Sequence, residues 1–399
     1  MMSLLLATLI FVAVTVVSIN VATGWRKIAE LRDVSFDSLT TGDTLPSVSI
    51  IVSACNEAFS IEPALRSLLE IDYPNLEIIA INDRSTDATP AILDRLSIAY
   101  PALKVVHLAS LPDGWLGKNH ALASGAALAK GEYLLFTDAD AVFSPTAVSR
   151  ALAYCQLHQV DHLALLFDVV APTRLLQMMI TSFVTGLMAK FQPWKVSHSP
   201  QHFIGIGGFN LVRTAAYQIA GGHAAIRLAV LDDLMLGQLI KAHGYTQHVL
   251  MGSGMVTIEW YPTTAGLFRG VEKNIFAAFD YRLGYLIALT VISGMTRVWP
   301  WLALFVVQGT AWWLYVATVL VSLLLTADLL RVRGWPLTNL LFAPLVPALE
   351  IMMWWRACLL TYVQGGIYWR GTFYSLAKIR HAHQDFKRSV ASLALRRTK

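Results

Sequence analysis

Charged residues are scarce in this sequence and make up only 14% of its 399 positions. Soluble proteins carry about 25%, and hydrophobic residues, at 55%, take their place here. This composition predicts a membrane protein. The net charge of +5 is not gathered into one long basic stripe, so a nucleic-acid partner is not expected. We expect the Lys and Arg residues beside apolar segments to contact anionic lipid headgroups and to set the topology.

Cysteine is also scarce, and Cys55, Cys155 and Cys358 show no metal-ligand spacing. An odd number of thiols does not predict a disulfide framework, and a reducing compartment suits them. Two nucleotide-binding signatures are missing. No Gly-x-Gly-x-x-Gly follows the first predicted strand, which argues against a dinucleotide fold, and the absence of Gly-x-x-x-x-Gly-Lys-Ser/Thr excludes a P-loop.

Residues 3–22 form a nearly continuous apolar run, which is long enough to span a bilayer. Arg26 and Lys27 follow it and no basic residue precedes it, so the positive-inside rule predicts that the chain enters the cytoplasm there. A cleaved signal peptide is the alternative, although basic residues usually precede its apolar core. We expect a transmembrane anchor over residues 1–25 and a polar linker over residues 26–46.

Apolar segments return late in the chain, at residues 284–306, 308–330 and 337–363. Arg331 and Arg333 precede the last of these and a basic tail follows it, so both of its ends are predicted to be cytoplasmic. One spanning helix cannot join two cytoplasmic ends, so either this segment is re-entrant or the number of segments differs by one. We expect membrane segments over residues 283–366 and a basic cytoplasmic tail over residues 367–399.

Two charged residues, Glu350 and Arg356, interrupt the last apolar segment. Charges are costly in lipid, so we expect both to face protein or a polar cavity, as a structural pair or as functional groups. Residues 261–282 predict an amphipathic helix with Arg269 and Lys273 on its polar side. This helix either lies in the headgroup layer, with its basic face open to phosphates, or packs on the globular domain.

Between the anchor and these segments, apolar β-branched runs alternate with helical stretches. This alternation predicts an α/β fold with an open, mostly parallel sheet. The strands are expected at residues 48–53, 76–81, 103–108, 133–137 and 162–167, and the helices at 60–70, 88–99, 118–130 and 145–157. The catalytic domain is expected over residues 47–260.

Polar clusters end three of these predicted strands, at residues 53–57, 82–87 and 137–141. Ligands bind at the carboxyl ends of parallel strands, so three clusters on one rim indicate a site. Asp138 and Asp140 form an Asp-x-Asp turn, which suits Mg²⁺ or Mn²⁺ with its remaining positions left to water and phosphate. A solvated turn is the alternative. Asp232 and Asp233 open a later helix, where they either complement its dipole or serve the same site.

These residues together resemble the family 2 glycosyltransferases with the glycosyltransferase A fold. The resemblance covers residues 48–245, in the order of the family. It is strongest to membrane-anchored members that glycosylate carotenoid, hopanoid or ceramide-like lipids, and residues 368–374 (YWRGTFY) loosely resemble their Trp-Lys-Gly-Arg-x-Tyr stretch. The matching stretches are 48–57 (VSIIVSACNE), 82–89 (NDRSTDAT), 114–121 (GWLGKNHA), 136–141 (FTDADA), 221–223 (GGH) and 231–234 (LDDL).

The resemblance implies a role for each matching position. Asp83 would bind the base or ribose of a nucleotide sugar, and Asp138 and Asp140 would bind the metal. Asp233 would be the general base, and Asp232, which stands where the family has Glu, would share its surroundings or its role. The other implied contacts are Asn56, Glu57 and Lys118 at the nucleotide, and His223, Trp260, Arg269 and Lys273 at phosphate or acceptor.

The processive members of the family carry Gln-x-x-Arg-Trp, which is missing here, so a single transfer is expected rather than polymer synthesis. We therefore expect a metal-dependent inverting glycosyltransferase that moves a sugar from a UDP-sugar to a hydroxyl of a membrane lipid. It would be a multi-pass protein of a bacterial cell membrane, with its catalytic domain in the cytoplasm. Two alternatives remain: a membrane nucleotidyl- or phospho-transferase with the same acidic clamp, and a non-catalytic scaffold on this fold.

Overall fold

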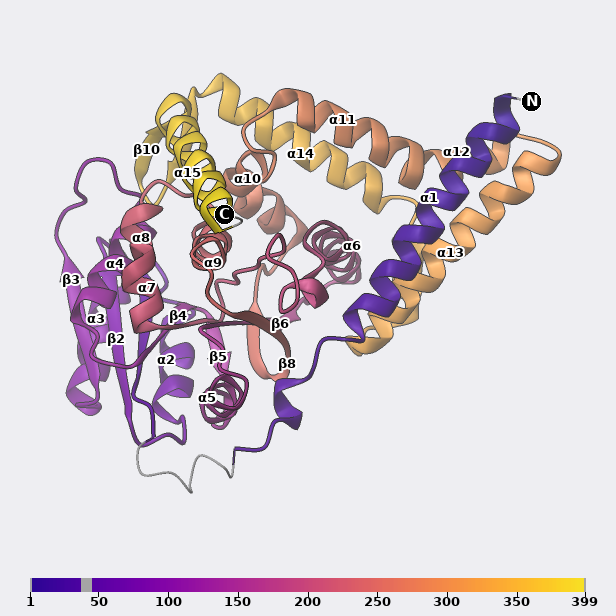
Figure 1. Ribbon diagram of the computed structural model, residues 1–399. Coiled ribbons are helices and arrows are strands. Elements are labelled where there is room, and N and C mark those ends of the chain that lie inside the picture. Colours follow the sequence, from indigo (N-terminus) through magenta and orange to yellow (C-terminus); the bar gives the residue numbers. More distant parts are fainter. Residues whose placement is uncertain (1, 37–44, 398–399) are drawn as a thin grey trace. The chain divides into compact units, whose positions relative to one another are not determined.

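A computed structural model describes residues 2–36 and 45–397 of the chain (Figure 1). Part of the expected linker, residues 37–44, therefore lies outside the described residues, as do the last two residues of the expected tail. The chain divides into two compact units. The sheet unit comprises Ile28–Val170, Lys195–Trp260 and Ile367–Lys399, and the helical unit comprises Met1–Lys27, Ala171–Trp194 and Tyr261–Gly366.

This division differs from the predicted boundaries in two places. Residues 171–194 fall inside the expected catalytic domain but belong to the helical unit. Residues 367–399 were expected to be a basic tail, yet they fold as part of the sheet unit. The reason is that they form a short hairpin, β9 (Gly366–Trp369) and β10 (Thr372–Ser375), and the amphipathic helix α15 (Leu376–Arg397). Phe386 of α15 is buried in the same cluster as Leu236 and Ile240 of α9 (Asp232–Ala242).

An eight-stranded sheet forms the centre of the sheet unit, in the order β3-β2-β1-β4-β7-β6-β8-β5. The first four strands of this order are parallel, β7 runs antiparallel to β4 and β6, and β5 runs antiparallel to β8. The α/β fold with a mostly parallel sheet is confirmed. The bounds are β1 Val48–Ala54, β2 Leu76–Asp83, β3 Leu103–Leu108, β4 Tyr133–Asp138, β5 Ala141–Phe143, β6 His162–Val170, β7 Asn210–Arg213 and β8 Gln247–Glu259.

The parallel strands lie where the apolar runs predicted them, because strands covered on both faces need side chains that are apolar on both faces. Every residue of β1 is buried, and Ile50 and Ile51 on its two faces have no exposed surface. Ile50 packs in the largest core cluster, whereas Ile51 packs in a second one on the other face. The helices that follow the strands are α2 Ile61–Leu69, α3 Thr89–Ala99, α4 Gly117–Leu128 and α5 Ala147–Leu157.

The sheet has a topological switch point between β1 and β4. The chain leaves β1 toward β2 and β3 on one side and returns to place β4 on the other side. The crevice at the carboxyl ends of two such strands is the usual ligand site of an open α/β sheet. Ser53 near the end of β1 lies opposite Asp138 at the end of β4 in the register of the two strands. The topology therefore places the acidic turn at the position where a ligand is expected.

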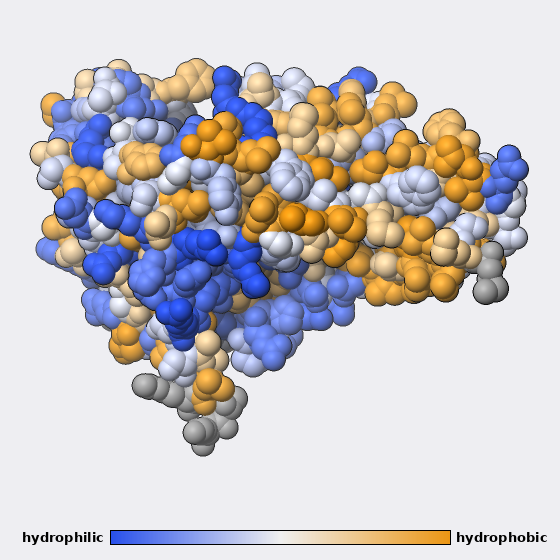
Figure 2. All heavy atoms as spheres, turned by 90° about the horizontal axis from the view of Figure 1, so that it is seen from above, coloured by the Kyte–Doolittle hydropathy of each residue, from blue (hydrophilic) through white to orange (hydrophobic). Residues whose placement is uncertain are grey.

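The helical unit contains three helical stretches long and apolar enough to cross a membrane: Met2–Trp25, Leu283–Val306 and Thr310–Val332. The second is built from α11 (Leu283–Ser293), a π-helical turn and α12 (Trp299–Val306). Within this unit, α1 (Met2–Trp25) packs along α13 (Thr310–Val332). Figure 2 shows hydrophobic residues gathered over α1, α12 and α13.

The last predicted apolar segment, residues 337–363, is divided into a 3₁₀ helix (Leu337–Phe342) and α14 (Val346–Val363). Its charges face protein, as expected, but they do not pair with each other. Glu350 Oε2 lies 2.7 Å from Arg297 Nη1, and Arg356 forms an ion pair with Glu272. The amphipathic helix α10 (Thr264–Ala278) buries its apolar side within the helical unit, where it packs against α14.

Candidate functional site

Lys118 joins the end of β4 to the start of α9. It is the second residue of α4, and its Nζ lies 2.8 Å from Asp138 Oδ1 and 3.3 Å from Asp232 Oδ2. Burial alone would lower the pKa of Lys118, but the carboxylates of Asp138 and Asp232 outweigh burial and raise it. Lys118 is therefore a permanent positive charge, held between two acidic positions that are separated by almost a hundred residues in the sequence.

Asp140 lies two residues beyond Asp138, where carboxylates crowd one another. The pKa of Asp140 is raised to about 7, first by burial and then by the negative charges of Asp138 and Glu57. The ammonium of Lys118 lowers this pKa only weakly by comparison. The acidic turn thus carries more negative charge than its protein neighbours neutralise, which is unlike a turn that is simply solvated.

Asp233 is held in a fixed orientation at the start of α9. Its Oδ2 accepts a hydrogen bond from the Gly207 N–H at 2.8 Å, and its Oδ1 accepts one from the Leu234 N–H at 2.7 Å. Its pKa is nevertheless raised to about 7, first by burial and then by the adjacent Asp232. Burial also raises the pKa of Asp232, against the lowering effect of Lys118. A carboxyl group that titrates near neutral pH is well suited to accept a proton.

A glycine-rich loop, residues 204–208, runs between Asp138 and α9. A Cβ at Gly207 would lie 2.5 Å from Asp138 Oδ2, and a Cβ at Gly205 would collide with the backbone carbonyl of Asp233. Glycine is required at both positions because the backbone approaches the acidic residues so closely. This agrees with the reading of the stretch as a close-approach segment rather than a phosphate loop.

A buried polar network, which sequence reasoning missed, supports this loop from behind. His162 Nδ1 accepts a hydrogen bond from Gln247, and its Nε2 donates to Asn210. Gln247 Nε2 also donates to the Ile204 carbonyl at 3.0 Å, and Asn210 Nδ2 donates to the Asp233 carbonyl at 3.4 Å. All three side chains of the network are almost completely buried. No local sequence signal connects them, because they come from β6, β7 and β8.

Asn56 and Glu57 join the end of β1 to the loop after β2. The Asn56 N–H donates to Ser85 Oγ at 3.0 Å, and Asn56 Oδ1 accepts from the Thr86 N–H at 2.7 Å. The Glu57 N–H donates to Thr89 Oγ1 at 2.8 Å. Asn56 has a φ of 58°, in the left-handed region that few residues other than glycine adopt. The backbone is therefore shaped tightly at this rim of the sheet.

Asp83, at the end of β2, has no exposed surface. Its Oδ1 accepts from Arg84 Nε at 2.8 Å, and its Oδ2 accepts from Arg370 Nη1 at 3.2 Å. Arg370 belongs to the turn of the β9–β10 hairpin and was not among the predicted site residues. The loose resemblance of residues 368–374 to a family stretch was the signal that could have found it.

The remaining predicted contacts are not brought together with the acidic cluster in one way. His223 is buried behind it, with its ring 4.7 Å from that of Phe136, and burial lowers its pKa to about 3. Trp260 follows the end of β8 in the sheet unit. Arg269 and Lys273 lie on α10 in the helical unit. Their predicted roles at phosphate or acceptor stay predictions.

A divalent metal ion fits the chemistry of the acidic turn. Asp138 and Asp140 supply hard oxygen donors, and their excess negative charge is what a divalent cation would neutralise. In the described part of the chain, no cluster of three or more His, Cys, Asp or Glu residues is arranged to hold a metal. This agrees with Mg²⁺-type binding through one or two carboxylates, in which water and substrate phosphates complete the coordination.

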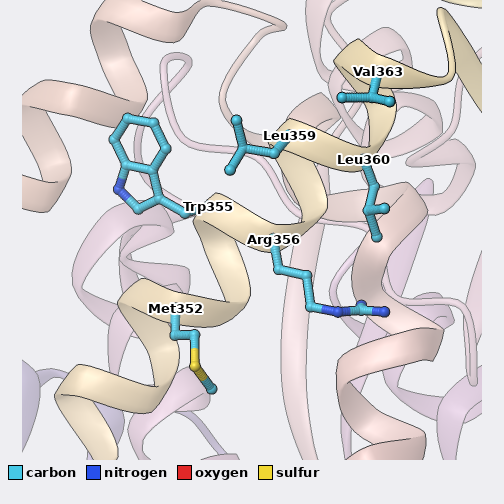
Figure 3. A pocket seen from close by; sticks show the side chains of 6 residues that line it. All are labelled: Met352, Trp355, Arg356, Leu359, Leu360 and Val363. Atoms are coloured by element: carbon cyan, nitrogen blue, oxygen red, sulfur yellow. The ribbon is translucent and has the colours of Figure 1, made fainter.

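An apolar depression of about 450 Å³ lies on α14 of the helical unit. Figure 3 shows its lining side chains, which all come from this one helix. Its one charged member, Arg356, already pairs with Glu272. A surface without a nucleophile or a base suits hydrocarbon rather than a reacting sugar. The remaining lining residues are Met352, Trp355, Leu359, Leu360 and Val363.

Comparison with known sequences gives one family and several relatives. Residues 49–219 match the family described as Glycosyl transferase family 2. A beta-monoglucosyldiacylglycerol synthase of Synechocystis sp. is 38% identical over 122 residues, which are 29% of this chain and 25% of that protein. A 4,4'-diaponeurosporenoate glycosyltransferase of Staphylococcus haemolyticus is 24% identical over 57% of this chain and 60% of that protein. The chain thus spans about a quarter of the first of these relatives.

A solved structure shares the fold. A mannosyltransferase from Pyrobaculum calidifontis, in complex with GDP-Man and Mn²⁺, superposes with a TM-score of 0.50. The alignment covers 90% of this chain and 99% of that one, at 19% sequence identity. At this identity the likeness concerns the fold, which includes the sheet and its order of elements.

Proposed function

We propose that this chain, whose residues 49–219 belong to glycosyl transferase family 2, transfers a sugar from a nucleoside diphosphate sugar to a hydroxyl group of a membrane lipid. One observation carries the proposal: Lys118 links Asp138 to Asp232 at the switch point of the sheet, beside the restrained carboxylate of Asp233. A cation and a base held side by side suit a reaction with an anionic leaving group and a protonated nucleophile.

The transfer needs a group that takes the proton of the acceptor. We assign this step to Asp233, whose carboxylate is fixed by the N–H groups of Gly207 and Leu234. As the acceptor oxygen bonds to C1 of the sugar, its proton passes to Asp233 and the bond from C1 to the nucleoside diphosphate breaks. A base on the face opposite the leaving group gives one displacement, so the configuration at C1 inverts. General base catalysis of this kind contributes about 10² to 10⁴ in rate.

The leaving nucleoside diphosphate needs positive charge around it. Lys118 supplies a permanent one next to Asp138. Asp138 and Asp140 would hold a divalent ion, which when bound neutralises the charge of the diphosphate. Asn56 and Glu57 shape the rim where the nucleoside would lie, and Asp83 lies at the adjoining strand end. We take UDP-sugars as the first donors to test, and GDP-sugars as the second.

A lipid acceptor is supported by the helical unit and by the named relatives. Three stretches of that unit could cross a membrane by length and composition, and the relatives are named for a glucosyldiacylglycerol and for a carotenoid acid. If these three stretches span, the residues after α1, those after α13 and the C-terminal segment all lie on one side. Arg26, Lys27, Arg331 and Arg333 make this side the cytoplasmic one. This arrangement needs no fourth span, and α14 would be the non-spanning segment.

The test uses the full chain in detergent or in vesicles, with UDP- or GDP-sugars, Mn²⁺ or Mg²⁺, and bacterial lipid extracts. We expect a new glycolipid by mass spectrometry, release of nucleoside diphosphate, and loss of both with EDTA. Asp233→Asn serves as the inactive control that still binds the donor. Release of nucleoside monophosphate or pyrophosphate would instead support a nucleotidyl- or phospho-transferase. No binding of any nucleotide sugar would support a scaffold.

A further inference from the structure

The β9–β10 hairpin ends in a turn that an arginine would not normally occupy. Arg370 and Gly371 form its two-residue connection, with φ values of 48° and 74°. Two-residue hairpin turns with two left-handed residues favour Asn, Asp or Gly at the first position, because a larger side chain is strained there. Strain of this kind is retained where the side chain has a use.

The hairpin holds three separate ends of the site rim. Arg370 Nη2 donates to the Ser53 carbonyl of β1 at 3.3 Å, and its Nη1 donates to Asp83 of β2. Thr372 Oγ1 accepts from Arg84 Nη1 at 3.2 Å. Tyr374 OH accepts from the Gly117 N–H at the start of α4, also at 3.2 Å. The hairpin is therefore fitted to the carboxyl edge of the sheet and is not a loose tail.

The charges at this rim are unbalanced in favour of an anion. Both oxygens of Asp83 are taken by guanidinium groups, and the carboxylate has no exposed surface. Two arginines thus share one carboxylate. In the described part of the chain, Arg84 Nη2 is buried without a hydrogen-bond partner. An unpaired guanidinium N–H is costly unless an oxygen acceptor reaches it, and arginine is the residue best shaped to bind phosphate oxygens.

The rim adjoins the acidic cluster through one helix start. A Cβ on Gly117 would lie 2.4 Å or more from the Asp83 carboxylate and the Arg84 guanidinium, so the backbone of α4 passes directly against them. The next residue is Lys118, which reaches Asp138 and Asp232. One extended anion could therefore contact the arginines at one end and Lys118 at the other. A nucleoside diphosphate has that form.

We propose that the β9–β10 hairpin completes the donor site, in which Arg84 and Arg370 bind the nucleoside diphosphate and Asp83 positions the two arginines. This rests on the proposed function of the chain. It assigns substrate contacts to a segment that lies 287 residues from Asp83 in the sequence, beyond the helices that could span a membrane. It also makes the C-terminal segment necessary for donor binding and leaves acceptor binding to other residues.

The test compares Arg370→Gln with Arg380→Gln in the full chain. Arg380 is an exposed residue of α15, so its variant makes the same charge change away from the rim. Titration with UDP and GDP should show Arg370→Gln weakening nucleotide binding about tenfold or more, because hydrogen bonds to charged groups are lost. The donor KM should rise equally while the acceptor KM stays unchanged. Arg370→Lys should restore part of the loss, and Arg380→Gln should match the wild type.

Two outcomes would overturn the inference. If folded Arg370→Gln binds nucleotide with the wild-type Kd, the hairpin only stabilises the sheet unit. If Arg370→Gln does not fold, Thr372→Val decides instead, because it removes only the acceptor for Arg84; a wild-type donor KM in that variant contradicts the inference. A wild-type protein that binds no nucleotide overturns the proposed function itself, so the two failures are distinguishable.

Discussion

Lys118 Nζ lies 2.8 Å from Asp138 Oδ1, and no acidic residue is its neighbour in the sequence. Because α4 begins at the carboxyl edge of the sheet, its second residue can reach the end of β4. The same ammonium contacts Asp232 of α9 at 3.3 Å. One side chain thus unites the two acidic pairs, and the consequences of removing it can be measured.

Lys118→Met should greatly reduce both donor turnover and stability. The variant leaves Asp138 and Asp232 buried or half-buried without their cation, and breaking a buried ion pair costs about 3–5 kcal/mol. We expect kcat/KM for the donor to fall by about a hundredfold or more, as for the loss of a charged group at a leaving phosphate. Lys130→Met, at an exposed position just beyond α4, is the matched control. Equal activity of the two variants would show that Lys118 is not in the site.

Asp233→Asn should lower kcat by about 10² to 10⁴ while the Kd for the nucleotide stays near the wild-type value, because a base acts on the acceptor. The amide is nearly isosteric, so the hydrogen bonds from Gly207 and Leu234 to the remaining oxygen can partly persist. Asp232→Asn is the comparison. Its carboxylate contacts Lys118, so it should weaken donor binding as well. If Asp232→Asn lost kcat alone and Asp233→Asn did not, the base would be Asp232.

Asp140→Asn should weaken the dependence of donor binding on divalent metal. The pKa of Asp140 is raised to about 7 by burial and by Asp138 and Glu57, which is the electrostatic condition that a cation would relieve. We expect the apparent Mn²⁺ affinity, measured by titrating activity or nucleotide binding, to fall by at least about tenfold, as for loss of a charged ligand. Nucleotide binding that is the same with Mn²⁺ and with EDTA in the wild type would count against a metal at this turn.

The parallel half of the sheet could be predicted because its strands are buried on both faces, so their sequences are continuous apolar runs. β5, β7 and β8 were not predicted. β5 and β7 are short, and β8 mixes polar residues with glycine because only some of its positions are buried. The acidic positions could be predicted from their places at strand ends. The contacts of Arg370 and the network around His162 could not, because both depend on segments that meet only in three dimensions.

The sheet unit should lose stability as the pH falls below about 6.5. His162 is fully buried, and burial lowers its pKa to about 4. An unfolded His has a pKa of about 6.5, so between these values the unfolded chain binds a proton that the folded chain does not. The stabilising contribution is complete above pH 6.5 and is lost progressively toward pH 4. His223, whose pKa burial lowers to about 3, adds to the same trend.

Thermal unfolding of the wild type and of His162→Gln at pH 7.5 and pH 5 measures this contribution. Glutamine is less stable at both values because the hydrogen bonds to Asn210 and Gln247 are altered. The difference between the two pH values is the informative quantity. It should shrink in the variant by about 2 kcal/mol, which is the linkage of one proton over about 1.5 pH units. An unchanged pH dependence would show that His162 does not resist protonation in the folded state.

In the helical unit, the pair of Arg297 and Glu350 should stabilise folding only as a pair. Glu350 is almost completely buried, and its Oε2 lies 2.7 Å from Arg297 Nη1. Glu350→Leu leaves a guanidinium without its partner in apolar surroundings, which costs about 3–5 kcal/mol. Arg297→Met leaves a buried carboxylate and should cost about as much. The double variant should recover most of this loss, because replacing a whole buried pair with apolar groups is often nearly neutral. Unfolding in detergent, followed by tryptophan fluorescence, gives the coupling energy from the four proteins. Additive losses in the double variant would mean that the two charges are stabilised by separate partners, and the unit would then tolerate each charge independently.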